Sequence, residues 1–219
     1  MDMEQARFNM VEQQIRPWDV LDQDVLDLLR QVRREDFVPE QYRELAFSDM
    51  EIPLGHGEAM LSPKLEARML QEVGVNATDQ VLEVGTGSGY LTALLARMAS
   101  RGNVHSVEIV PEFSARAAAI LREHGIANIT LETGDAARGW IQGGPYDVIV
   151  LTGSVPVLPE AFSASLKIGG RLFAVVGEAP VMEAQLITCV AEGVYRTTNL
   201  FETSVPPLKN AMQPQRFIF

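Results

Sequence analysis

From residue 78 onward, short apolar runs alternate with longer amphipathic stretches. The apolar runs are rich in Val, Ile and Leu, and they lie at 80–84, 103–109, 129–132, 146–151 and 171–176. The stretches between them carry apolar residues at helical spacing, as in 90–99. Strands that are apolar throughout are typical of a parallel sheet covered by helices on both faces. We therefore predict a three-layer α/β fold with a mostly parallel, seven-stranded sheet, and further strands at 184–190 and 216–219 predict an antiparallel edge.

The N-terminal 77 residues have a different pattern, in which charged residues alternate with apolar residues at helical spacing. Pro17 separates two predicted helices, and the Pro- and Gly-rich segment 52–57 predicts a loop. Ser62 and Pro63 predict the N-cap and the first residue of a helix that ends at Gly74. We expect one domain over 1–219, in which residues 1–77 form a helical extension of an α/β core at 78–219.

The chain carries 29 acidic and 18 basic residues, for a net charge of −11. A negative surface repels phosphate backbones and anionic lipids, so we expect neither nucleic-acid nor membrane partners. The longest run without charge or histidine, 84–96, is too short to span a bilayer. The single cysteine, Cys189, cannot form an internal disulfide, and the acidic N-terminus is unlike a signal peptide. These features predict a cytoplasmic protein, and the scattered histidines predict no metal site.

The segment Glu83–Gly89, E-V-G-T-G-S-G, lies between a predicted strand and a predicted helix. Open α/β sheets bind their ligands at such positions, and glycines let the backbone approach the ligand closely. The dinucleotide pattern G-x-G-x-x-G fails because Tyr90 stands where its third glycine belongs, and no phosphate-loop lysine follows. The loop therefore predicts a ligand without phosphates, held by Glu83, Gly85, Thr86, Gly87, Ser88 and Gly89.

Acidic residues follow the next two predicted strands. Glu108 ends the strand after the glycine loop, where a carboxylate can accept hydrogen bonds from ribose hydroxyls. Asp135 and Ala136 follow the strand after that, where a carboxylate can accept from an exocyclic adenine amine. Together with the loop, these positions predict a site for an adenosine compound that carries no phosphate.

The E-x-G-x-G-x-G loop resembles the first motif of class I S-adenosylmethionine (SAM) methyltransferases. Over nearly its full length, the chain resembles the protein-L-isoaspartate O-methyltransferase family, at 10–16, 32–39, 52–57, 81–93, 146–152, 166–172 and 205–208. The resemblance implies a Rossmann-like methyltransferase fold whose last two strands exchange places relative to most SAM methyltransferases. It also implies SAM as cofactor, S-adenosylhomocysteine as product, and methyl transfer to the isoaspartyl carboxylate of damaged proteins or peptides. A carboxylate is ionised at pH 7, so this reaction requires no general base.

One stretch departs from the family pattern. The family has a serine whose hydroxyl lies beside the acceptor carboxylate, but alignment on Gly57 and Pro63 places Leu61 there and Ser62 one residue later. Ser62 is therefore a candidate catalytic residue if the loop shifts, and a helix N-cap otherwise. The resemblance places His56, Leu61, Ser62 and Val205 on the substrate side.

Several alternatives remain open at this point. The chain can be a SAM methyltransferase for another acceptor, or a SAM-binding protein that lacks isoaspartyl activity because Leu61 replaces the serine. A nicotinamide-dependent oxidoreductase is disfavoured by the failed dinucleotide pattern. The sequence does not decide the oligomeric state, for which a monomer is the simplest expectation.

Overall fold

The computed structural model describes residues 2–214 of the chain. Its centre is a seven-stranded sheet with the strand order β5-β4-β3-β6-β7-β8-β9. The strands are β3 (Gln80–Val84), β4 (Asn103–Glu108), β5 (Ile129–Thr133), β6 (Tyr146–Val155), β7 (Leu166–Glu178), β8 (Val181–Ala191) and β9 (Val194–Thr203). The strands from β5 to β7 pair in parallel, whereas β8 and β9 pair antiparallel. The predicted mostly parallel sheet with an antiparallel edge is confirmed, and β8 precedes β9 in the order that the resemblance implies.

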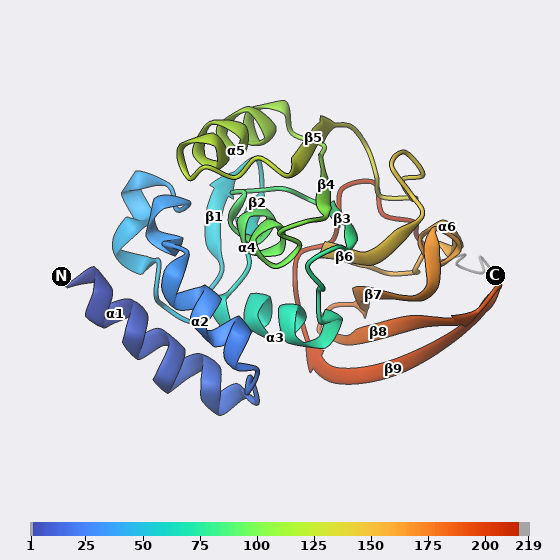
Figure 1. Ribbon diagram of the computed structural model, residues 1–219, viewed down its shortest axis with the longest axis horizontal. Helices are drawn as coiled ribbons and strands as arrows, with labels where there is room; N and C mark the ends of the chain where they lie inside the picture. The colour runs from blue at the N-terminus through green and yellow to red at the C-terminus, as the bar shows by residue number, and fades with distance from the viewer. Residues whose placement is uncertain (1, 215–219) are drawn as a thin grey trace.

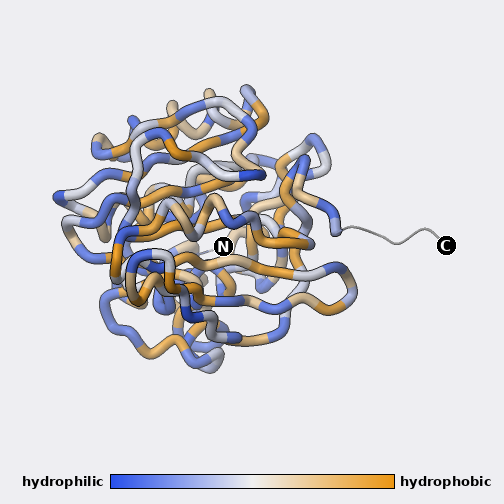
Figure 2. Tube along the Cα trace, turned by 90° about the vertical axis from the view of Figure 1, so that its right-hand side faces the viewer, coloured by the Kyte–Doolittle hydropathy of each residue, from blue (hydrophilic) through white to orange (hydrophobic). Residues whose placement is uncertain are grey.

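Helices cover the two faces of this sheet (Figure 1). They are α3 (Pro63–Val73), α4 (Tyr90–Met98), α5 (Pro111–Glu123) and α6 (Glu160–Ala164). Alternate residues of β6 separate the two cores: Val148 and Val150 pack with α3, α4 and α5, whereas Ile149 packs with Phe162 of α6. In Figure 2, hydrophobic residues follow the interior strands, and hydrophilic residues are frequent in the outer loops.

The N-terminal extension packs against the same face as α3 and α4. It contains α1 (Met3–Met10), η1 (Val11–Ile15), η2 (Arg16–Trp18), α2 (Gln23–Gln31), η3 (Arg34–Asp36) and η4 (Glu40–Leu45). Its apolar residues, such as Ile15 and Leu29, belong to the same buried cluster as the sheet residue Val148. The extension and the sheet therefore share one core. None of the helices in the part of the chain that the structure describes is long and apolar enough to cross a membrane.

The local structure differs from the sequence analysis at two places. The predicted loop at 52–57 is a hairpin of β1 (Ile52–Gly55) and β2 (Glu58–Met60), because residues with positive φ at 55–57 supply a tight turn. The sequence reading missed β9, whose side chains are mostly exposed and therefore give no apolar run. The predicted strand at 216–219 lies outside the described residues.

Candidate active site

The glycine loop between β3 and α4 lies directly against β6. Gly85, Gly87 and Gly89 all have positive φ, which favours glycine. A Cβ on Gly85 would lie 2.1 Å from Thr152 Oγ1. The Thr152 hydroxyl lies 2.9 Å from both the Val84 and the Gly85 carbonyl oxygens, to which it donates. Only glycine permits this close approach of the loop to the end of β6.

Glu108 connects the loop to the end of β4. Its Oε2 accepts a hydrogen bond from the Gly87 amide at 2.8 Å, and its Oε1 accepts one from the Val110 amide at 2.9 Å. The residue is only 4% exposed and lines the main cavity. Because an ionised carboxylate has about four acceptor positions, Glu108 keeps capacity for a ligand hydroxyl.

Asp135 occupies the corresponding place after β5. Its Oδ1 accepts from the Ala137 amide at 3.0 Å, and its Oδ2 accepts from the Asn210 side chain at 2.9 Å. Both Asp135 and Ala136 line the main cavity. The chain thus brings two of the three predicted strand-end acids, Glu108 and Asp135, to one cavity.

Glu83, the third predicted acid, does not line the main cavity, nor the smaller cavity beside it. Its Oε2 accepts from Thr92 at 2.5 Å and from Ser106 at 2.6 Å, and the Ser106 hydroxyl lies 2.6 Å from that of Thr86. Burial raises the pKa of Glu83 to about 8, so its carboxyl group is protonated at neutral pH. The position of Glu83 differs from the prediction because its side chain points beneath the loop, where it joins a buried hydrogen-bond network with Thr86.

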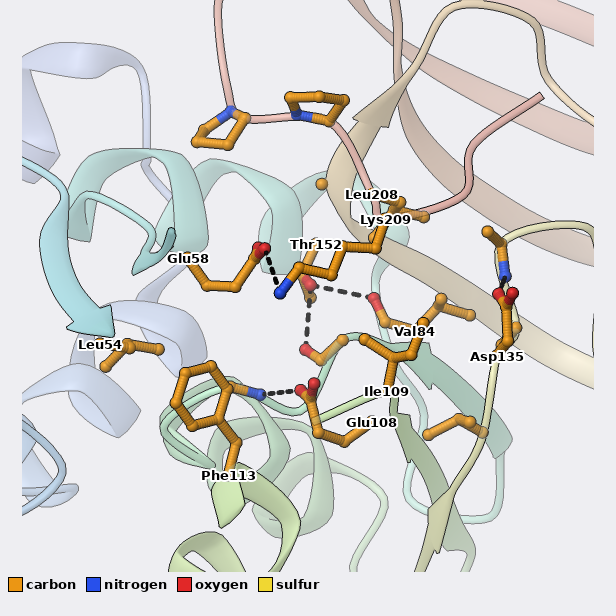
Figure 3. Close-up of a pocket in the computed structure, with 18 of the residues that line it drawn as sticks. Leu54, Glu58, Val84, Glu108, Ile109, Phe113, Asp135, Thr152, Leu208 and Lys209 are labelled. Atoms are coloured by element: carbon orange, nitrogen blue, oxygen red, sulfur yellow. Dashed lines mark hydrogen bonds and ion pairs between the residues drawn. The ribbon is translucent and has the colours of Figure 1, made fainter. Parts of the chain in front are cut away.

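The main cavity lies at the carboxyl ends of the strands (Figure 3), and with the open solvent at its mouth it has a volume of about 680 Å³. The hairpin, the glycine loop, the ends of β4, β5 and β6, and the segment 206–209 form its walls. A smaller cavity of about 320 Å³ adjoins it. The two share Leu54, Ala59, Leu61, Gly85, Gly87 and Thr152, and Ser88 and Glu66 line only the smaller one.

The predicted substrate-side residues separate in the structure. Leu61 lines both cavities. Ser62 stands at the N-cap of α3, but its side chain makes no capping hydrogen bond, and it lines neither cavity. The exposed His56 has its ring edge-on to Phe113, with 5.4 Å between ring centroids. Val205 is buried, and its carbonyl accepts from Ser154 Oγ at 3.0 Å.

The family model for protein-L-isoaspartate (D-aspartate) O-methyltransferases matches residues 5–210. The chain belongs to this family. The family member named protein-L-isoaspartate O-methyltransferase 1 from Rhodopseudomonas palustris strain HaA2 is 43% identical over 171 residues, which cover 78% of this chain and 69% of the relative. Its namesake from Anaeromyxobacter sp. strain Fw109-5 is 39% identical over 194 residues, covering 88% of this chain and 91% of the relative.

Two solved structures of isoaspartate methyltransferases have the same fold. One is 25% identical with a TM-score of 0.79, over 94% of this chain and 65% of that longer chain. The other, from Plasmodium falciparum, is 20% identical with a TM-score of 0.79, over 95% of this chain and 99% of that one. The Plasmodium protein was solved in complex with S-adenosyl-L-homocysteine.

Two sets of interactions beside the cavities were missed by sequence reasoning. Arg34, fully buried, donates to the Leu61 carbonyl at 2.6 Å and forms an ion pair with Glu66. Burial raises the pKa of Glu66 to about 7. Lys209 follows the family-like segment 205–208, and it reaches back across the chain to Glu58. No local sequence motif predicts the roles of these residues, because their partners lie far away in the sequence.

Proposed function

We propose that this protein transfers a methyl group from SAM to the isoaspartyl carboxylate of damaged proteins or peptides. The observation that carries the proposal is the placement of the glycine loop, Glu108 and Asp135 around one cavity. Membership of the isoaspartate methyltransferase family supports the same activity. The proposal also takes residues 1–219 as one methyltransferase domain, which the shared core of the extension and the sheet supports.

The residues of the main cavity fit SAM. Glu108 would accept from the ribose hydroxyls, and Asp135 with Ala136 would border the adenine. Gly85 and Gly87 would border the remaining, methionine part of the cofactor. Acidic walls suit a cofactor whose sulfonium is cationic, whereas they would repel a pyrophosphate.

The acceptor carboxylate arrives already ionised, so the chain has to position it rather than deprotonate it. SAM supplies the methyl group; a carboxylate oxygen bonds to the methyl carbon while the carbon–sulfur bond breaks, and the electron pair stays on sulfur. Leu54, Ala59 and Leu61 are the apolar wall shared by both cavities. We infer that this wall desolvates the carboxylate where the two cavities meet.

A second candidate function follows from Leu61. Its side chain lines both cavities at the position of the family serine, so the site lacks that hydroxyl. SAM-dependent methylation of another carboxylate is the candidate that this observation favours. In either case we propose a protein or peptide partner rather than nucleic acid, a monomer, and a cytoplasmic location, which the single buried cysteine supports.

The test is methyl ester formation on an isoaspartyl peptide, with the matching aspartyl peptide as control. We expect a base-labile ester on the first peptide and not on the second. SAM should also raise the melting temperature, whereas NAD should not. Ester on extract proteins with none on the isoaspartyl peptide would replace the first proposal by the second, and stabilisation by NAD alone would refute both.

A further inference from the structure

The two cavities are lined by more acidic than basic groups. Glu58, Glu108 and Asp135 line the main cavity, and Glu66 lines the smaller one. Among the described residues that line them, Lys209 is the one lysine or arginine. Glu66 is already compensated by its ion pair with the buried Arg34. An acceptor carboxylate therefore meets the three acidic side chains of the main cavity, and the Lys209 ammonium is the cation in the walls that can compensate its charge.

The backbone on both sides of Lys209 is held in place. The Leu208 amide donates to the Ser154 carbonyl at 2.9 Å, and the Asn210 side chain donates to Asp135 at 2.9 Å. Between these anchors, the Lys209 side chain extends across the cavity toward Glu58 (Figure 3). The ammonium thus points from the C-terminal segment to the β1–β2 hairpin, over the groups that line the site.

The ammonium of Lys209 has two partners among the described residues. Its Nζ lies 3.1 Å from Glu58 Oε1 and donates to the His56 carbonyl at 3.1 Å. A lysine ammonium has three N–H donors, so one is left for a ligand. The side chains of Lys209 and Glu58 are 37% and 29% exposed. Ion pairs with such access to water contribute little to stability, so exchanging Glu58 for another carboxylate costs little.

We propose that Lys209 is a specificity residue. Its ammonium binds the carboxylate of the acceptor peptide that is to be methylated, and this carboxylate replaces Glu58 as its ion-pair partner. This inference rests on the proposed function, because it requires a carboxylate acceptor. Methylation converts the carboxylate into a neutral ester, which no longer forms an ion pair with the ammonium. Lys209 then returns to Glu58, and the product loses a contact that the substrate had.

The same charge change determines which kinetic constant responds. The negative charge of the carboxylate falls as the oxygen–carbon bond forms, so an ion pair with Lys209 is stronger in the ground state than in the transition state. Lys209 therefore lowers KM for the peptide and discriminates against the ester product, but it does not raise kcat.

The experiment compares Lys209→Gln with Lys167→Gln in the full chain. Lys167 forms a similarly exposed ion pair with Asp147 at 2.7 Å, and neither residue lines a cavity, so its variant is the matched control. For Lys209→Gln we expect KM for an isoaspartyl peptide to rise about tenfold, the loss typical of one charge-assisted hydrogen bond. The affinities for the methyl ester peptide and for SAM should stay unchanged, and kcat should not fall, because the lost ion pair stabilised the ground state more than the transition state. Lys167→Gln should alter none of these quantities.

Glu58→Gln supplies the decisive second variant. It removes the competing carboxylate, so KM for the peptide should fall, opposite to the effect of Lys209→Gln. If both variants raise KM, the pair is a structural clamp and the proposal is wrong. It is equally wrong if Lys209→Gln weakens SAM binding alone, which would assign the ammonium to the carboxylate of the cofactor. An unmodified protein that forms no ester on the peptide would instead refute the proposed function itself.

Discussion

The backbone amide of Gly87 donates a hydrogen bond to Glu108 Oε2 across 2.8 Å. This contact joins the middle of the glycine loop to the end of the next strand, so these two walls of the main cavity hold one another in position. The other oxygen of the same carboxylate fixes the first turn of α5 through the Val110 amide at 2.9 Å. A change at Glu108 therefore affects the glycine loop and the start of α5 together.

Glu108→Gln should weaken SAM binding. The glutamine amide group turns an N–H toward one of the two backbone donors and removes the charge that strengthens ribose hydrogen bonds. We expect the dissociation constant for SAM, measured by calorimetry, to rise about tenfold or more. Glu112→Gln, an exposed change on the neighbouring helix, is the control. Unchanged binding by Glu108→Gln would exclude this carboxylate from the cofactor site.

Gly85→Ala should abolish cofactor binding. The new Cβ would lie 2.1 Å from Thr152 Oγ1, and φ at this position is +98°. The loop must then leave β6 and lose its contact with Thr152. Gly193→Ala is the matched control, since Gly193 also has positive φ (+68°) but no neighbour within 4 Å of the added atom. Retained SAM binding by Gly85→Ala, in thermal shift measurements, would show that the loop tolerates a side chain here.

The free energy of unfolding should fall as pH rises from about 5 to about 8 because of Glu83. Its pKa is raised from 4.5 to about 8 in the folded state, so the folded protein keeps a proton that the unfolded chain has released. This contribution is complete below the unfolded pKa and is lost as pH rises through the folded pKa. Glu66, raised to about 7, acts in the same direction.

Glu83→Gln should make this pH dependence less steep, because glutamine stays neutral while it can still accept from Ser106. Urea unfolding at several pH values measures the slope. The exposed substitution Glu123→Gln should leave it unaltered. An unchanged slope in Glu83→Gln would mean that the buried carboxyl is not the group responsible.

Leu61→Ser should increase kcat/KM for an isoaspartyl peptide, because it places a hydroxyl at the position of the family serine. Leu61→Ala separates this effect from the loss of bulk. Both variants should lower stability by about 2 kcal/mol, since Leu61 is only 6% exposed. If serine and alanine change the activity equally, cavity size rather than the hydroxyl determines which acceptor is used.

The parallel part of the sheet was predictable because its central strands, β3, β4 and β6, are largely buried. β3, β4 and β6 contain runs of Val, Ile and Leu that are distinct from the helical spacing around them. β9 gives no such signal: its residues are mostly exposed, and pairing with β8 keeps it in place. The hairpin at 52–60 was likewise hidden, since two glycines and a proline in one short segment are equally typical of a loop.

The site was predictable where function depends on local sequence. The glycine loop, Glu108 and Asp135 are each recognisable from their places after strands. Glu83 also lies near the end of a strand, but side chains alternate between the two faces of a strand, and that of Glu83 points toward the core. Lys209 and Arg34 act through partners more than 25 residues away, at Glu58 and Leu61, and no pattern in a single sequence reveals such contacts.

The walls of the main cavity extend along the chain from Leu54 to Lys209. A ribosome synthesises the N-terminal side of this enclosure first, and the segment 206–209 emerges after all seven strands of the sheet. Cofactor binding can therefore not assist the early folding of the nascent chain. The sheet and its helices must fold on their own packing energy, and a ligand of this cavity stabilises a sheet that is already assembled.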